Sequence, residues 1–190
     1  MASASSARRD VLEGAGITFD VDPALMDEAA SRNERPEMSP DETAAHLAFE
    51  KAKIVSRRHQ NTFVIGADQT MECDGRSFDK PRDMMEARRH LTYLRGRTHV
   101  LHSAVCVIRD QKMLWSTVQD ARLIMRDFDD GFLDEYLEQA GESVLTSVGC
   151  YRLESHGAHL FSAIEGDFFT ILGLPLLPLL GFFRNAEILH

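Results

Sequence analysis

The sequence predicts an α/β fold with a mixed sheet. Predicted strands alternate with predicted helices along the chain, and one pair of strands is joined by a tight turn at Arg109-Asp110-Gln111. Interleaved strands and helices are typical of α/β proteins, and a hairpin adds an antiparallel pair. At 190 residues the chain is long enough for one domain with a full core, or for two lobes that share one sheet. We therefore expect residues 1–190 to form a single domain.

The individual elements follow from hydrophobic periodicity and from turn residues. An apolar run at residues 62–67 ends at Asp68, which places this acid at the end of a strand. Further strands are expected at 98–108, 113–119, 121–125, 147–154 and 159–166. Helices are expected after Arg9 until Gly14 and Gly16 end the stretch, at 39–58, at 82–94 with Met85 inward, at 130–139, and after Gly173-Leu174-Pro175. The acidic stretch 20–35 reads as a loop.

The helix at 39–58 has the clearest start signals. Ser39 is a predicted N-cap, Pro40 occupies the first helical position, and Glu42 completes a capping box. Lys51 falls on the apolar stripe of this helix. A lysine in that position either extends to the surface or meets an anion, and both alternatives remain open at this point.

Asp68 is a candidate catalytic or metal-binding group, because ligands of α/β sheets usually bind at the carboxyl edge of the strands. Lys80 precedes a proline and therefore lies in an extended segment, from which we expect it to point into a cleft beside Asp68. Near the N-terminus, hydroxyl groups precede a helix that has arginines in its first turn. This pattern suits a phosphate cradle, although it also suits simple capping or a solvated end.

Composition excludes several classes of function. A formal net charge of −9 and a pI near 5.3 argue against binding to polymeric nucleic acid. Cys73, Cys106 and Cys150 form no metal-type pattern, and no secretory signal is apparent, so we expect reduced thiols and a cytoplasmic protein. The most apolar tract, residues 168–183, is interrupted by proline and glycine and is too short for a comfortable membrane span.

Seven separate motifs, in order, resemble those of the Maf-like nucleoside triphosphate pyrophosphatases, and the likeness covers essentially the whole chain. These motifs are Ala2-Ser3-Ala4-Ser5-Ser6-Ala7-Arg8, Asp27-Glu28, Leu47-Ala48-Phe49-Glu50-Lys51-Ala52, Ile65-Gly66-Ala67-Asp68, Lys80-Pro81, Gly149-Cys150-Tyr151 and Gly173-Leu174-Pro175-Leu176. The resemblance implies an elongated, mixed, twisted sheet flanked by helices, with two lobes and a central cleft. It also permits a homodimer.

The resemblance further implies hydrolysis of a nucleoside triphosphate between its α- and β-phosphates. Asp68 is then the base that activates water. The charge of the phosphates is balanced by Arg8, Lys51, Lys80 and a divalent metal, Mg²⁺ or Mn²⁺. Ser3 and Ser5 are implied to donate hydrogen bonds to phosphate oxygens, Glu28 is implied as a metal ligand, and Asp68 as a second one.

Two positions point to the branch of the family that is associated with 7-methyl-GTP. Gln69 follows the catalytic acid, and Glu154 lies in the expected late strand; the branch that prefers dTTP and UTP typically has Thr and Gln there. A carboxylate suits a guanine edge or a positively charged methylated ring. Ala7 departs from the family pattern and leaves the pyrimidine alternative open. A second alternative is a nucleotide-binding regulator of cell division with little turnover.

Overall fold

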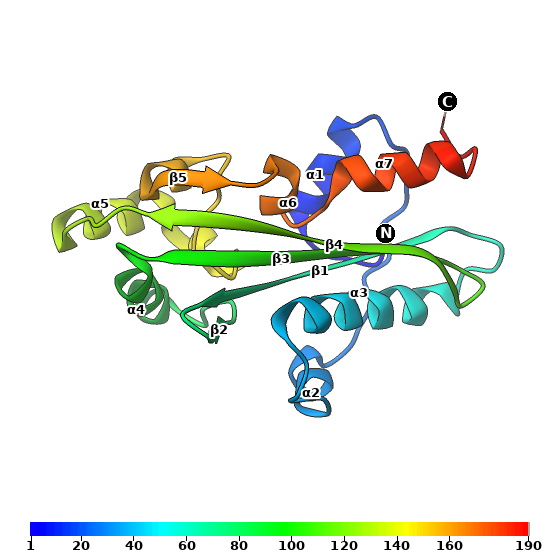
Figure 1. The fold of residues 1–190 in the computed structure, drawn as a ribbon, viewed down its shortest axis with the longest axis horizontal. Helices are drawn as coiled ribbons and strands as arrows, with labels where there is room; N and C mark the ends of the chain where they lie inside the picture. Colours follow the sequence, from blue (N-terminus) through cyan, green and yellow to red (C-terminus); the bar gives the residue numbers. More distant parts are fainter. Residues whose placement is uncertain (190) are drawn as a thin grey trace. The chain divides into compact units, whose positions relative to one another are not determined.

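The computed structural model describes residues 1–189, which form a five-stranded antiparallel sheet flanked by helices (Figure 1). The strand order is β2-β1-β3-β4-β5. The strands are β1 (Val64–Cys73), β2 (Arg76–Phe78), β3 (Thr98–Arg109), β4 (Lys112–Met125) and β5 (Phe161–Glu165). The predicted α/β class and twisted sheet flanked by helices are confirmed, and the observed pairing shows that the sheet is antiparallel.

Seven α-helices and two 3-10 turns are found among the described residues. They are α1 (Ser6–Gly14), α2 (Glu28–Asn33), α3 (Pro40–Ser56), α4 (Met84–Leu94), α5 (Asp130–Ala140), η1 (Gly141–Thr146), η2 (His156–Leu160), α6 (Phe168–Ile171) and α7 (Leu176–Asn185). No helix within residues 1–189 is both long and apolar enough to cross a membrane.

The chain divides into two compact units. The first contains Met1–Gln69, His102–Gln119 and the described chain from Asp167 onward, and the second contains Thr70–Leu101 and Asp120–Gly166. The chain passes between the units within β1, β3 and β4, and once more after β5, between Gly166 and Asp167. That residues 1–190 form a single domain stays a prediction.

In the first unit, successive side chains of the strands alternate between two apolar cores. Ala104, Cys106 and Ile108 of β3 pack in the core that contains the inner face of α3. Val105 and Val107 pack instead in the core that contains α1 and α7. Figure 1 shows these helices on opposite sides of the strands. By the same alternation, neighbouring residues of β1 present their side chains to opposite helical layers.

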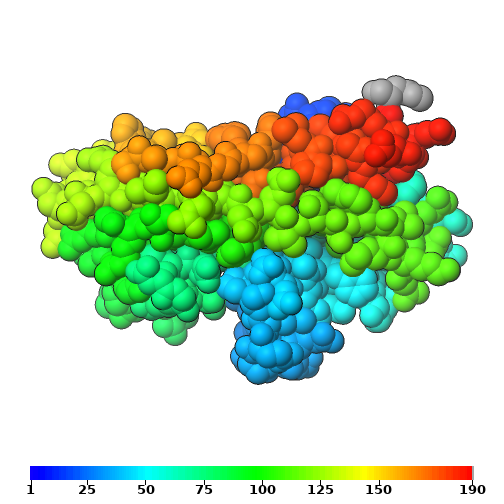
Figure 2. Space-filling model, in the orientation of Figure 1, coloured from blue at the N-terminus to red at the C-terminus, as the bar shows by residue number. Residues whose placement is uncertain are grey.

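Helix α3 begins as predicted. Ser39 is its N-cap, Pro40 is at the first turn, and the Glu42 side chain completes the capping box by accepting from the Ser39 backbone N–H at 3.0 Å. The helix ends at Ser56, close to the expected end. The short helix α2, which lies where a loop is expected, has no buried residue and appears as a protrusion beside α3 in Figure 2.

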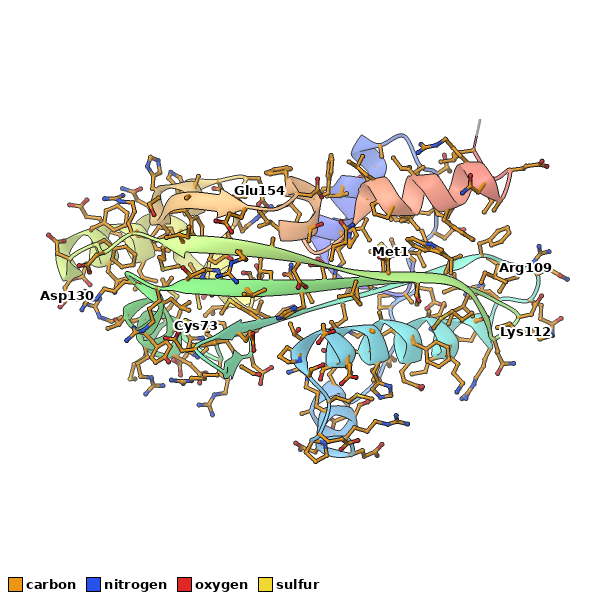
Figure 3. The ribbon with its side chains drawn as sticks, in the orientation of Figure 1. Met1, Cys73, Arg109, Lys112, Asp130 and Glu154 are labelled. Atoms are coloured by element: carbon orange, nitrogen blue, oxygen red, sulfur yellow. The ribbon has the colours of Figure 1, made fainter. Side chains whose placement is uncertain are left out.

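Three other predictions differ from the structure. Strand β1 continues past Asp68 as far as Cys73, because Met71 and Cys73 remain buried on the same strand. The strands expected at 113–119 and 121–125 form one long strand, β4, and Figure 3 shows Arg109 and Lys112 on either side of the turn that leads into it. Met85, expected to face inward, is 66% exposed.

The expected strand at 147–154, in the second unit, is wrong. Cys150 has φ 59°, which an extended strand does not allow. A Cβ on Gly149 would lie 2.2 Å from the Tyr151 ring, so the chain folds back tightly at this point. The Tyr151 hydroxyl instead meets His99 Nε2 at 2.7 Å, and both rings pack with Phe161. The segment therefore serves as a packed turn.

Candidate functional site

Helix α3 makes direct backbone contact with β1 at Gly66. A Cβ built at Gly66 would lie 2.1 Å from the carbonyl oxygen of Ala48 and 2.7 Å from the Cβ of Ala52. Only glycine permits so close an approach. Because Lys51 lies between these two alanines along the helix, and Asp68 lies two residues after Gly66 on the strand, this contact brings the two charged side chains together.

Lys51 and Asp68 form a buried ion pair. The Nζ of Lys51 donates to Asp68 Oδ1 at 2.5 Å and lies 2.8 Å from Glu28 Oε1. Lys51 is 7% exposed and Asp68 is 4% exposed, so the lysine does not extend to the surface. Of the two alternatives for Lys51, the structure shows an anionic partner, and it is supplied by two carboxylates of the chain itself. An ammonium group carries three N–H donors, so one remains for a further acceptor.

The second carboxylate oxygen of Asp68 is the most notable atom of this site. Asp68 Oδ2 is buried and has no hydrogen-bond partner among residues 1–189. Buried polar atoms in proteins almost always have a partner, because an unsatisfied one costs about 1–3 kcal/mol. An unsatisfied acceptor next to a lysine is suited to receive a proton from water or to bind a cation.

Arg8 lies in the same unit and is also buried. Its Nε donates to Gly173 O at 2.8 Å, and one terminal nitrogen donates to Ala67 O at 2.9 Å and to Ser3 Oγ at 3.0 Å. Burial lowers the pKa of the Arg8 guanidinium, whereas the charges of Asp68 and Glu28 act in the opposite direction. The guanidinium is thus held rigidly beside the residue that precedes Asp68.

Ser5 caps helix α1, since its Oγ accepts from the Arg8 backbone N–H at 3.4 Å. Ser3 Oγ accepts both from Arg8 and from the Ser5 backbone N–H at 3.3 Å. Both hydroxyl oxygens therefore act as acceptors in these contacts. Their own hydrogens are the groups that could donate to a phosphate oxygen, which stays a prediction.

Gln69 faces the other side of β1. Its Nε2 donates to Ser103 Oγ at 2.8 Å, to Ile171 O at 3.1 Å and to Thr170 O at 3.2 Å. Gln69 is thus separated from the Lys51 and Asp68 pair, in keeping with strand alternation.

Lys80 and Glu154 belong to the second unit. Lys80 is exposed in the segment between β2 and α4. Glu154, labelled in Figure 3, lies in the turn before η2, where its Oε1 accepts from Arg152 Nε at 2.8 Å. The roles inferred for these two residues remain predictions.

The described residues include no group of three or more His, Cys, Asp or Glu side chains placed to hold a metal ion. Glu28 and Asp68 nevertheless both contact the same lysine, and one Asp68 oxygen is unsatisfied. Magnesium is commonly held by one or two carboxylates, with phosphate oxygens and water completing the shell. The oxygen donors of Glu28 and Asp68 fit that type of site.

Several residues that build this region carry little signal in the sequence. Gly66 stands there as part of a motif, and a glycine within a strand can indicate a close backbone approach. Ser31 and His46, which join α2 to α3 through a contact of 3.2 Å between Oγ and Nε2, gave no recognisable signal. Ser103 gave none either, because its partners lie more than thirty residues away.

An α/β fold that buries a lysine, an arginine and an aspartate with a free oxygen defines a candidate site for hydrolysis of an anionic substrate. Comparison with known proteins agrees with that class. The sequence model of the family described as Maf-like protein matches residues 1–186. The chain therefore belongs to the Maf-like protein family.

Three relatives illustrate the similarity. The chain is 49% identical over 189 residues to a protein of Nitrobacter hamburgensis named nucleoside triphosphate pyrophosphatase, covering 100% of this chain and 94% of that protein. A protein of the same name from Paramagnetospirillum magneticum is 51% identical over 191 residues, covering 99% and 98%. A protein of Rhizobium meliloti named 7-methyl-GTP pyrophosphatase is 47% identical over 187 residues, covering 97% and 94%.

Proposed function

We propose that this chain is a nucleoside triphosphate pyrophosphatase that hydrolyses the bond between the α- and β-phosphates, releasing a nucleoside monophosphate and pyrophosphate. The observation that carries this proposal is the buried Lys51 and Asp68 pair, in which one carboxylate oxygen remains unsatisfied. The names of the relatives support the same reaction class. Three buried free cysteines suit a reducing compartment and support action in the cytoplasm.

Asp68 is the proposed general base. Its Oδ2 can accept a proton from an attacking water, while Oδ1 remains bonded to Lys51, which fixes the orientation of the carboxylate. Lys51 can direct its third N–H donor to a phosphate oxygen without releasing either carboxylate. Charge that develops on the phosphates would then be stabilised by fixed cations, which is the main requirement of phosphoryl chemistry.

Arg8 supports the same site from the N-terminal helix, and Lys80 is the proposed cation of the second unit. Ser3 and Ser5 are the proposed hydroxyl donors to phosphate. We also propose a divalent metal, Mg²⁺ or Mn²⁺, held by Glu28 and Asp68. When bound, such an ion neutralises phosphate charge and orients the phosphate oxygens.

For the base, we propose a preference for 7-methyl-GTP. The residue types at Gln69 and Glu154 support it, and so does the name of one relative. Methylation at N7 gives the guanine ring a positive charge, which the carboxylate of Glu154 would favour. In the structure that carboxylate accepts a hydrogen bond from Arg152, so base binding would compete with this contact.

The test is release of pyrophosphate and nucleoside monophosphate from 7-methyl-GTP, GTP, dTTP, UTP and CTP, with Mg²⁺, with Mn²⁺ and with chelator. We expect 7-methyl-GTP to give the highest kcat/KM and chelator to abolish turnover. A preference for dTTP or UTP would contradict the base assignment alone. Nucleotide binding without turnover would favour a regulator. Turnover in the presence of chelator would contradict the proposed requirement for a divalent metal.

A further inference from the structure

We propose that Gln69 determines nucleotide preference as a positioning residue, without contacting the base. Gln69 and Ser103 form hydrogen bonds that fix the turn at residues 170–173, and we call these contacts the latch. The turn then orients Arg8. This inference rests on the proposed function, because it concerns the same substrate site. All of these residues belong to the first unit.

The orientation of the Gln69 amide carries the first step. Its NH₂ group points to the carbonyl oxygens of Thr170 and Ile171, at 3.2 Å and 3.1 Å. Backbone carbonyls only accept hydrogen bonds, so the reversed amide would place oxygen against oxygen. The NH₂ group of Gln69 therefore donates its hydrogen bonds within the protein. Its side-chain carbonyl oxygen is the group that remains for any other contact.

Ser103 completes the latch from the neighbouring strand β3. Its Oγ donates to Thr170 O at 2.7 Å and accepts from Gln69 Nε2 at 2.8 Å. Ser103 and Thr170 are both fully buried, at 0% exposure, so neither can touch a nucleotide. The other side of the turn is held by Asp167, whose Oδ2 accepts from the Thr170 backbone N–H at 2.8 Å. The turn is thus fixed from two directions.

The same turn leads directly to Arg8. The Gly173 backbone N–H donates to Thr170 O at 3.0 Å, and Gly173 O accepts from Arg8 Nε at 2.8 Å. Gly173 has φ +89°, and a Cβ there would lie 3.2 Å from Arg8 Nε, so the arginine packs on a bare backbone. A shift of the turn therefore moves the acceptor that fixes the guanidinium plane.

A shorter side chain at position 69 would loosen this connection. Threonine has one hydroxyl donor in place of two N–H donors, and it ends closer to the backbone. A threonine hydroxyl could not donate hydrogen bonds to Thr170 O and Ile171 O at the same time. A change of nucleotide preference on substituting Gln69 would then report movement of the turn and of Arg8, with no lost contact to a base.

The experiment compares dissociation constants for 7-methyl-GTP and UTP in an Asp68→Asn background, where binding is measured without turnover. Ser103→Ala and Gln69→Thr are each added, and then both together. We expect each single substitution to change the ratio of the two constants in the same direction by at least threefold. The double variant should change the ratio no more than the larger single variant, because both act on one latch.

Ser162→Ala is the matched control. Its Oγ also donates to a backbone carbonyl, that of Ile124 at 3.1 Å, and we expect an unchanged ratio. General destabilisation would weaken the binding of both nucleotides equally and leave the ratio constant.

The proposal is overturned if Gln69→Thr changes the ratio and Ser103→Ala does not, because Gln69 would then contact the base itself. It is also overturned if the Asp68→Asn protein binds neither nucleotide, or if no variant shifts the ratio of the two dissociation constants. Absence of turnover in the wild type would contradict the proposed reaction alone, since the binding test does not depend on it.

Discussion

The carbonyl oxygen of Ala48 on α3 occupies the space in which a side chain at Gly66 on β1 would begin, 2.1 Å from the Cβ position. This contact sets how near the helix lies to the strand and hence whether Lys51 reaches Asp68. We predict that Gly66→Ala forces α3 outward and costs about 3 kcal/mol in the free energy of unfolding. It should also lower turnover at least tenfold, as measured by urea unfolding and pyrophosphate release.

Gly14→Ala is the control for that substitution, because no atom of residues 1–189 lies within 4 Å of a Cβ at Gly14. It should leave turnover unchanged and change the free energy of unfolding by less than about 1 kcal/mol. Full activity in Gly66→Ala would show that the close contact does not position the pair.

The Lys51 and Asp68 pair makes a second prediction. Lys51→Met keeps the aliphatic stem but leaves the Asp68 carboxylate buried without its ammonium partner, which should cost about 3 kcal/mol of stability. Adding Asp68→Asn removes the stranded charge and should recover part of this loss. A double-mutant cycle by urea unfolding measures the coupling, and simple additivity of the two substitutions would contradict a buried ion pair.

Gly173 provides a test of the backbone that carries Arg8. Gly173→Ala introduces a side chain at φ +89° and within 3.2 Å of Arg8 Nε, so we expect a loss of about 1–2 kcal/mol and weaker nucleotide binding. Gly181 lies within α7, and among the described residues a Cβ there meets only Arg184, at 4.0 Å. The control Gly181→Ala should be neutral or stabilising by up to about 1 kcal/mol, as helix propensity predicts. Similar losses in both variants would argue against a special role for the turn.

The buried His99 ring predicts a dependence of stability on pH. Burial lowers the pKa of His99 to about 4 in the folded chain, from an ordinary value near 6.5. Between these values the unfolded chain binds a proton that the folded chain excludes, so stability falls as the pH is lowered. From pH 7 to pH 4.5 this group lowers the free energy of unfolding by about 2 kcal/mol.

Urea unfolding of the wild type and of His99→Gln at both pH values isolates this contribution. On acidification, the free energy of unfolding of the variant should fall by about 2 kcal/mol less than that of the wild type. Equal losses in the two proteins would show that other groups account for the acid sensitivity.

Local signals in the sequence predicted α3 and the β3–β4 hairpin well, because capping and turn residues act within a few positions. The start at Ser39 and Pro40 is confirmed, and so is the turn at Asp110-Gln111. The strand expected at 147–154 failed because the tight packing of Tyr151 on Gly149 overrides an apolar pattern. The predicted end of the strand at Asp68 was also wrong, because an acid at this position does not stop a strand whose following residues remain buried.

The candidate site was predictable in its residue types and less so in its contacts. The apolar position of Lys51 left two alternatives open, extension to the surface or contact with an anion, and the structure shows contact with an anion. One of the anionic partners of Lys51 is Glu28, which belongs to the separate short helix α2. This contact depends on the tertiary arrangement of α2 and α3, which local sequence does not reveal. The partners of Gln69 are more than thirty residues away, and two of them are backbone carbonyls, which any sequence provides. Such contacts leave no trace in local residue patterns.

The central claim is that Asp68 is the base of a pyrophosphatase. The most direct measurement is pyrophosphate release from saturating 7-methyl-GTP by the wild type and by Asp68→Asn, with nucleotide affinity measured in parallel. We predict that the variant binds nucleotide within about tenfold of the wild type and loses at least a thousandfold in kcat. Turnover by Asp68→Asn at a rate close to that of the wild type would contradict the assignment.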